Sequence, residues 1–133
     1  MLERALEFRG KVPKDYQSNF FKEGFVYGSL ILCEDDTEST IINNEYEAQV
    51  LTDSVGQFTG SFDVDGNKIF EGDIVECKGE RCQVVWLEKR CGFYLLFNGF
   101  SRDIVNRSPY QSVYKMNAFK KKIIGDIHNG QTL

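Results

Sequence analysis

Apolar and polar residues alternate in short runs along this chain, a pattern typical of half-buried antiparallel β-strands. In the first part of the chain the runs lie at residues 6–10, 24–32 and 46–51, with the pair Ile41-Ile42 and the turn signal Asn43-Asn44 before the last. We therefore expect residues 1–54 to form an antiparallel meander of short strands.

The stretch from residue 55 to residue 77 organises the rest of the pattern. Asp65-Gly66 is a hairpin signal, because Gly takes positive φ without steric cost and Asp hydrogen-bonds its own turn. Glu71-Gly72-Asp73 forces a second turn before the strand start at Ile74. There we expect Asp73 to bond backbone amides, so that Gly72 and Asp73 are structural. A Gly-Asp turn followed by β-branched residues is typical of the first strand of an SH3-like barrel.

Further strands are predicted at residues 74–77, 81–87, 93–97, 100–105 and 122–127, and Asn98-Gly99 is the hairpin dipeptide after the third. A period of two residues places Cys82, Val84 and Trp86 on one face of their strand. Between the last two strands, Ser108 as N-cap and Pro109 as first helical residue predict a short helix, with Tyr110, Val113 and Tyr114 at helical spacing.

These patterns together predict a mainly β fold in a single domain of residues 1–133. Residues 55–133 are expected to form an SH3-like barrel, and residues 1–54 an N-terminal antiparallel β-meander packed on it. One short helix completes the expected architecture.

Two segments of this stretch resemble the core signature of the YopX family of phage and prophage proteins. They are VGQFTG at residues 55–60 and DGNKIFEGDIV at residues 65–75, and weaker matches lie at residues 6–11 and 123–127. The tail departs from the family pattern, since Asp126 and Asn129-Gly130 stand where the family has Asn and Asn-Pro. The resemblance implies a β-rich fold with an SH3-like barrel and no established activity.

The sequence gives little support to catalysis or to a bound cofactor. The segment 63–67 resembles part of a Ca²⁺ loop, but the bidentate Glu of the EF-hand template is missing at Gly72, which favours an Asx-rich turn. His128 is the single histidine, so a Ser-His-Asp triad or a base-activated Cys has one candidate base, near the end of the chain. Carboxylates of Glu71, Asp73 and Asp126 remain a candidate cluster. We expect no catalytic residue, no metal and no cofactor.

The cysteines and the apolar runs bear on the compartment. The N-terminal segment has no apolar stretch of the secretory type, and no run has the length of a transmembrane helix. We therefore expect a cytosolic protein whose cysteines, at positions 33, 77, 82 and 91, are free thiols. Their spacing does not form the paired CxxC knuckles of a zinc site.

Charge and aromatic residues suggest partners. Residues 34–47 carry six acids and no base, whereas Lys115 to Lys122 holds four lysines and no acid. The acidic run would repel a phosphate backbone, and the lysine cluster is small for a nucleic-acid footprint. Aromatic residues exceed what a small barrel needs inside, unless the two parts of the chain share them in one core. The candidate partner-binding residues are Tyr94, Phe97, Phe100, Tyr110, Tyr114, Lys115, Lys120, Lys121 and Lys122.

The sequence therefore favours a non-enzymatic phage or prophage accessory protein that contacts an unknown host or phage protein in the host cytosol, without membrane association. The alternative is a nucleic-acid-binding SH3-like module that uses the lysine cluster and nearby aromatics. Surplus aromatics and open strand edges also predict self-association into a homo-oligomer.

Overall fold

The computed structural model of the protein describes residues 6–13, 24–32, 37–77, 79–97, 110–112 and 120–130. The described residues form antiparallel β-strands and 3₁₀ turns without an α-helix, so the fold is mainly β. Contacts divide the chain into two compact units, Met1–Phe58 and Thr59–Leu133. The sequence pattern placed the internal boundary between residues 54 and 55; this division falls a few residues later, inside a strand.

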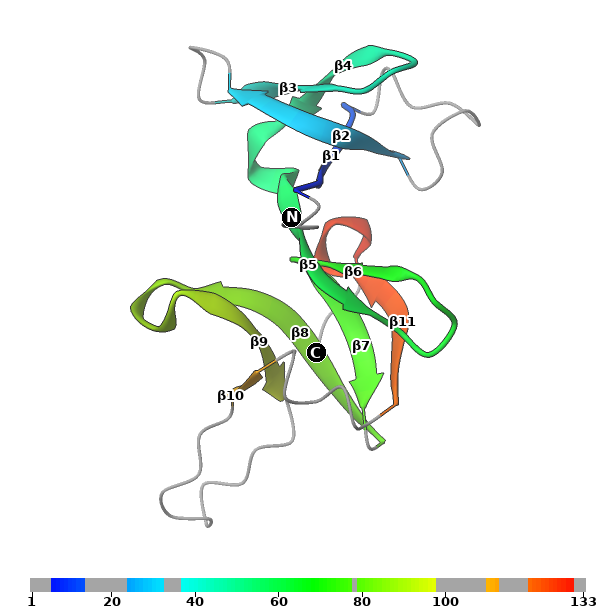
Figure 1. The fold of residues 1–133 in the computed structure, drawn as a ribbon, viewed down its shortest axis with the longest axis vertical. Coiled ribbons are helices and arrows are strands. Elements are labelled where there is room, and N and C mark those ends of the chain that lie inside the picture. The colour runs from blue at the N-terminus through cyan, green and yellow to red at the C-terminus, as the bar shows by residue number, and fades with distance from the viewer. Residues whose placement is uncertain are drawn as a thin grey trace, which may run out of the picture. The chain divides into compact units, whose positions relative to one another are not determined.

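The first unit is built from consecutive antiparallel strands (Figure 1). These are β1 (Phe8–Lys11), β2 (Phe25–Leu32), β3 (Glu38–Ile42) and β4 (Glu47–Leu51), followed by the 3₁₀ turn η3 (Thr52–Ser54) and the start of β5 (Gly56–Phe62). Their order in the sheet is β4-β3-β2-β1-β5. The turn between β3 and β4 is held by Asn43, whose side-chain Oδ1 accepts hydrogen bonds from the backbone N–H groups of Glu45 and Tyr46. Asn43 therefore acts as the turn residue that its type predicts.

The inner face of this sheet buries Val12, Val26, Ile41 and Val50 in one cluster. Gly10 of β1 lies against this cluster, and a Cβ built on it would stand 2.5 Å from Cγ2 of Val50. Only glycine fits such an approach without movement of the valine, so the packing of β4 on β1 depends on the missing side chain at position 10.

The second unit contains the end of β5 and the strands β6 (Lys68–Phe70), β7 (Asp73–Cys77), β8 (Glu80–Leu87), β9 (Gly92–Phe97), β10 (Tyr110–Ser112) and β11 (Lys121–Asp126) (Figure 1). A 3₁₀ turn, η4 (Glu88–Arg90), joins β8 to β9, and another, η6 (Ile127–Asn129), follows β11. The main sheet has the order β10-β9-β8-β7-β11, and β5 pairs with β6. In the described residues this sheet is open, so a closed SH3-like barrel is not confirmed.

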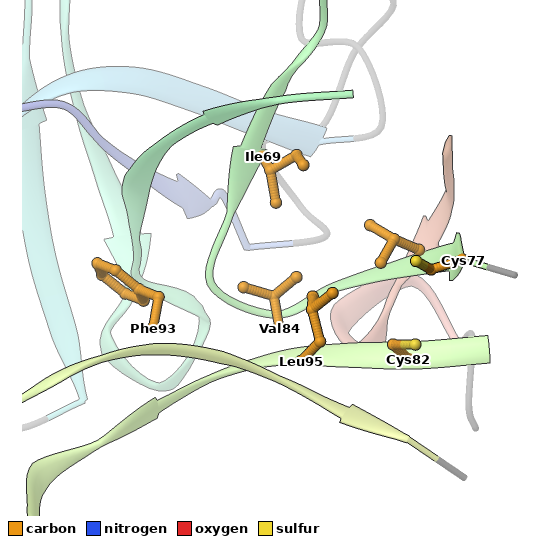
Figure 2. Close-up of a cluster of buried hydrophobic side chains, with 7 residues drawn as sticks. Ile69, Cys77, Cys82, Val84, Phe93 and Leu95 are labelled. Carbon is orange, nitrogen blue, oxygen red and sulfur yellow. The ribbon is translucent and has the colours of Figure 1, made fainter. Parts of the chain in front are cut away.

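The core of the second unit lies between β6 and the inner face of the main sheet. Figure 2 shows Ile69 extending toward Val84 and Leu95, with Cys77 and Cys82 in the same cluster. The period of two in β8 buries Cys82 and Val84, as predicted. Trp86 lies on the same face of β8, but its side chain is 42% exposed.

The prediction of a short helix after Ser108 is wrong for residues 110–112, which are the part of it that the structure describes. Tyr110–Ser112 is a strand, paired with Leu96, Leu95 and Tyr94 of β9. The ladder with β9 supplies hydrogen bonds that a one-turn helix cannot match, and it overrides the local Ser-Pro signal. Ser108, Pro109, Val113 and Tyr114 lie outside the described residues, as do Asn98-Gly99 and the strand predicted at 100–105.

The close approach at Gly10 gives a stability prediction. Gly10→Ala should lower the free energy of unfolding by about 1–3 kcal/mol, because the new methyl group overlaps Val50. Combining it with Val50→Ala should cost less than the sum of the two single changes, since the second substitution removes the overlapping atoms. Gly92→Ala is the control, as its nearest contact would be an ordinary 3.4 Å. Urea unfolding of the four variants measures these values, and additive costs would contradict the packing.

Candidate functional site

The carboxylate of Asp63, at the turn between β5 and β6, accepts several hydrogen bonds. Its Oδ1 accepts hydrogen bonds from the backbone N–H groups of Asp65 (3.0 Å) and Asn67 (2.8 Å). Its Oδ2 accepts from the backbone N–H of Ile123 in β11 at 3.2 Å. Asp63 therefore closes its own turn and ties that turn to a strand 60 residues away.

The charge of Asp63 is stabilised by these contacts. Burial acts to raise the pKa of Asp63, but the hydrogen bonds donated by Asn67, Ile123 and Asp65 together outweigh it and hold the pKa below the usual aspartate value. The carboxylate is therefore ionised and committed to backbone amides, which leaves it poorly suited to act as a general base.

A buried lysine lies beside this turn. Lys121 of β11 is 2% exposed, and its Nζ donates to the Oγ of Ser61 at 3.1 Å. The backbone N–H of Val64 donates to the carbonyl of Lys121 at 2.7 Å, so the β5–β6 turn covers the outer flank of β11. Burial lowers the pKa of Lys121, while the nearby Cys77 thiol acts in the opposite direction. The polar residues of β5 and β11 thus form one buried network.

Asp73 and Asp126 face each other across β7 and β11 and are both buried. Asp73 Oδ2 accepts from the backbone N–H of Phe70 at 2.8 Å, which holds the turn before β7. Asp126 accepts from the backbone N–H groups of His128 and Asn129 and from the side-chain amide of Asn129. The topology thus brings together two of the carboxylates that the sequence left as a candidate cluster, but both hold turns.

The glycines of the predicted turns lie where backbone geometry requires them. Gly66 has φ of 83° and Gly72 has φ of 95°, both in the left-handed region. Gly72 also donates its N–H to the carbonyl of Val84 and accepts from the N–H of Ile127. The side chain that organises the first turn is Asp63, two residues before Asp65, and Asp65 itself is exposed. Within the described residues, no cluster of three or more His, Cys, Asp or Glu has the arrangement of a metal site.

The structure separates the predicted partner-binding residues. Lys120 and Lys122 are exposed, but Lys121 between them is buried, so the lysine cluster does not present all its charges on one surface. Phe97 packs against the core cluster of the second unit. Tyr94 is half-buried, with the Arg90 guanidinium 5.4 Å from its ring centre. Phe100, Tyr114, Lys115 and the side chain of Tyr110 lie outside the described residues.

Trp86 is an exposed aromatic that sequence reasoning did not select. Its ring meets the buried Phe93 ring edge-to-face at 5.0 Å, which fixes its orientation at the end of the β8–β9 hairpin. Arg90 and Tyr94 lie on the same hairpin. The sequence signal was weak, because period two assigns Trp86 to the core face. The charged turn at residues 88–90, close by in the sequence, is the signal that could have indicated exposure.

The described cysteines differ in environment. Cys77 and Cys82 are buried free thiols, whereas Cys91 is an exposed free thiol in the turn before β9. Burial, together with the neighbouring charges of Cys77 and Glu80, raises the pKa of Cys82 to about 12. Cys33 lies outside the described residues.

Antiparallel sheets whose turns are held by buried carboxylates define a small, mainly β protein. Comparison with protein families places the chain more closely: the model described as YopX protein matches residues 17–133. The chain belongs to the YopX family. A search of curated proteins found no match. Among the described residues, no helix has the length and apolar character needed to cross a membrane.

The hydrogen bonds of Asp63 predict a pH-dependent contribution to stability. Because its pKa is lower in the folded protein than in the unfolded chain, this contribution is complete above about pH 4 and is lost as the pH falls through the folded pKa. Asp63→Asn should lower the free energy of unfolding by about 2 kcal/mol at neutral pH and flatten its decline in acid. The exposed Asp65→Asn is the matched control. Chemical unfolding between neutral and acidic pH tests this, and equal profiles for wild type and Asp63→Asn would contradict it.

Thiol reactivity should follow burial. In folded protein, Cys91 should react rapidly with Ellman's reagent, while Cys77 and Cys82 should react only on unfolding, because the thiolate is the reactive form and buried thiols are neutral and inaccessible. Cys91→Ser should remove a rapid equivalent without changing the slow ones. Rapid modification of Cys82 in folded protein, located by peptide mass mapping, would show that its surroundings are open.

Proposed function

We propose that this protein is a non-enzymatic phage or prophage accessory protein that acts through protein–protein contacts in the host cytosol. One observation carries the proposal. The buried ionisable side chains of the second unit, Asp63, Asp73, Asp126 and Lys121, are engaged in hydrogen bonds that hold turns and strands. Groups committed in this way serve the fold, and membership of the YopX family is consistent with that reading.

The contact surface that we propose is the end of the β8–β9 hairpin. Trp86 is 42% exposed and held by Phe93, and aromatic residues fixed in this way dominate the energetics of many protein interfaces. Arg90 over the Tyr94 ring adds a cation at the same hairpin. As part of this proposal, residues 55–133 form an SH3-like barrel, a fold that commonly binds extended peptides through surface aromatics. The hydrogen bonds between the β5–β6 turn and β11 support the proposed barrel, because they join strands that are far apart in the sequence.

Affinity capture from infected or induced host cells tests the proposal, with quantitative comparison of wild type and Trp86→Ala. A host or phage protein enriched by wild type should be reduced about tenfold or more by Trp86→Ala, as expected for an aromatic interface residue. Ile127→Ala is the control, since Ile127 is similarly exposed at 39%. Equal recovery with all three proteins, or no enriched protein, would contradict the proposed surface.

A nucleic-acid-binding role is the second candidate, supported by the adjacent exposed side chains of Lys120 and Lys122. If this role holds, retention on DNA or RNA should fall steeply with salt, and Lys120→Ala with Lys122→Ala should weaken it. Retention that is absent at low salt would exclude this candidate. Burial of Lys121 and the acidic run at residues 34–47 make protein contact the better proposal.

A further inference from the structure

The pairing of β2, β3 and β4 defines an outer face on the sheet of the first unit, with β3 between the other two strands (Figure 1). Residues directly opposite each other lie on the same side of a sheet, and successive residues of a strand alternate between its two sides. Val26, Ile41 and Val50 fill the core on the inner side. Among the residues that alternate with them and project outward are Tyr27, Ile31, Glu38, Ile42, Glu47 and Leu51.

Within the described residues of this outer face, four large apolar side chains are exposed to solvent. Ile31 is 49% exposed, Leu51 40%, Ile42 38% and Tyr27 37%. Single exposed apolar residues are ordinary on a protein surface, whereas a group of them on one face of neighbouring strands marks a contact site. The outer face therefore has the character of a surface that another element covers.

The charges on and beside this face are acidic. Glu47 is exposed and Glu38 is half-buried on the face itself, and the exposed Glu45 lies in the β3–β4 turn next to it. The basic residues of the neighbouring strand β1 do not offset these carboxylates. Arg9 is buried with its guanidinium over an aromatic ring, and Lys11 is half-buried. An element that covers the face must therefore carry positive charge along its border to match these carboxylates.

The edge of β4 beside this face is closed at its Leu51 end. The hydroxyl of Ser54 donates to the carbonyl of Leu51 at 2.6 Å and accepts from the N–H of Lys11 in β1 at 2.7 Å. A partner that covers the face therefore makes contact through side chains and needs its own backbone groups satisfied internally. An α-helix meets this requirement, and packing of a helix on a sheet face is a standard layer arrangement.

We propose that the outer face of β2, β3 and β4 binds a basic amphipathic helix of a partner protein. The apolar stripe of that helix packs on Ile31, Ile42 and Leu51, and Lys or Arg residues at the border of the stripe pair with Glu38 and Glu47. Three strands span about 10 Å, which is the width of one helix, and five residues of strand extend about 17 Å, the length of about three helical turns. A second copy of this face and an anionic membrane surface carry the same negative sign as the face, so charge opposes both.

Designed peptides test the proposal on the full-length protein. The first is a labelled helical peptide with a leucine stripe bordered by lysines. The second has the same leucine stripe with glutamates in place of the lysines, and the third has the composition of the first with its leucines scattered around the helix. Fluorescence anisotropy should show that the first binds about tenfold or more tightly than the other two. Its dissociation constant should rise with salt, because salt screens the charge pairs.

A double substitution, Ile31→Thr with Ile42→Thr, tests the apolar contact. Thr keeps the β-branched shape that suits a strand but removes exposed apolar surface, so the dissociation constant of the lysine peptide should rise about fivefold or more. Val64→Thr with Ile127→Thr is the matched control, since these residues are 52% and 39% exposed in the second unit. Circular dichroism melting establishes that each variant is folded.

A second pair of substitutions, Glu38→Gln with Glu47→Gln, tests the charge contact. It should weaken binding of the lysine peptide about threefold or more and reduce the dependence on salt. Glu80→Gln with Glu88→Gln, at exposed positions of the second unit, changes the net charge equally and is the control.

Three results would overturn the proposal. The first is equal binding of the lysine and glutamate peptides. The second is a dissociation constant that Ile31→Thr with Ile42→Thr leaves unchanged, because binding would then follow charge alone. The third is a dimer of the wild-type protein that the same two substitutions abolish, because a second copy would then be the occupant. Trp86→Ala should leave peptide binding unchanged, so failure of this proposal leaves the proposed function standing, and the reverse also holds.

Discussion

The hydrogen bonds that converge on the carboxylate of Asp63 are the constraint on which the second unit depends. They join a local turn to β11, a strand far along the chain, and the backbone of Val64 reinforces the same connection. Hydrogen bonds from amides to a charged carboxylate are stronger than hydrogen bonds between neutral groups. Because this carboxylate is partly buried, the loss of one of these hydrogen bonds costs more stability than it would at the surface. The β5–β6 pair is therefore held over the core that Ile69 fills.

Buried carboxylates also hold the turns at one end of β7 and β11. Asp73 and Asp126 are buried and lie opposite each other, an arrangement that in a cleft would suggest acid–base chemistry. Here each accepts hydrogen bonds from nearby turns. Their role is to fix chain reversals at one end of β7 and β11. The exposed Trp86 belongs to the surface that we propose as a contact site.

The two units treat their sheet edges differently. In the second unit the β5–β6 turn covers β11, using a lysine that is itself buried and bonded to Ser61. In the first unit β4 ends the strand order, and the Ser54 hydroxyl donates to its Leu51 carbonyl while accepting from the N–H of Lys11 in β1. Both arrangements satisfy backbone groups at a strand edge without pairing to another chain.

The sequence by itself determined the strands, because alternation and turn chemistry are local. Asp65-Gly66 marked a hairpin, Gly72 and Asp73 a second turn, and the period of two placed Cys82 and Val84 inside. The tertiary structure decided what depends on distant neighbours. Pairing with β9 made Tyr110–Ser112 a strand despite the helix signal at Ser108-Pro109. Lys121, which belongs to a lysine cluster in the sequence, is buried and bonded to Ser61, 60 residues away. Asp63 accepts a hydrogen bond from the backbone of Ile123, also 60 residues away. Local pattern cannot report such contacts, since they exist only after the strands have assembled.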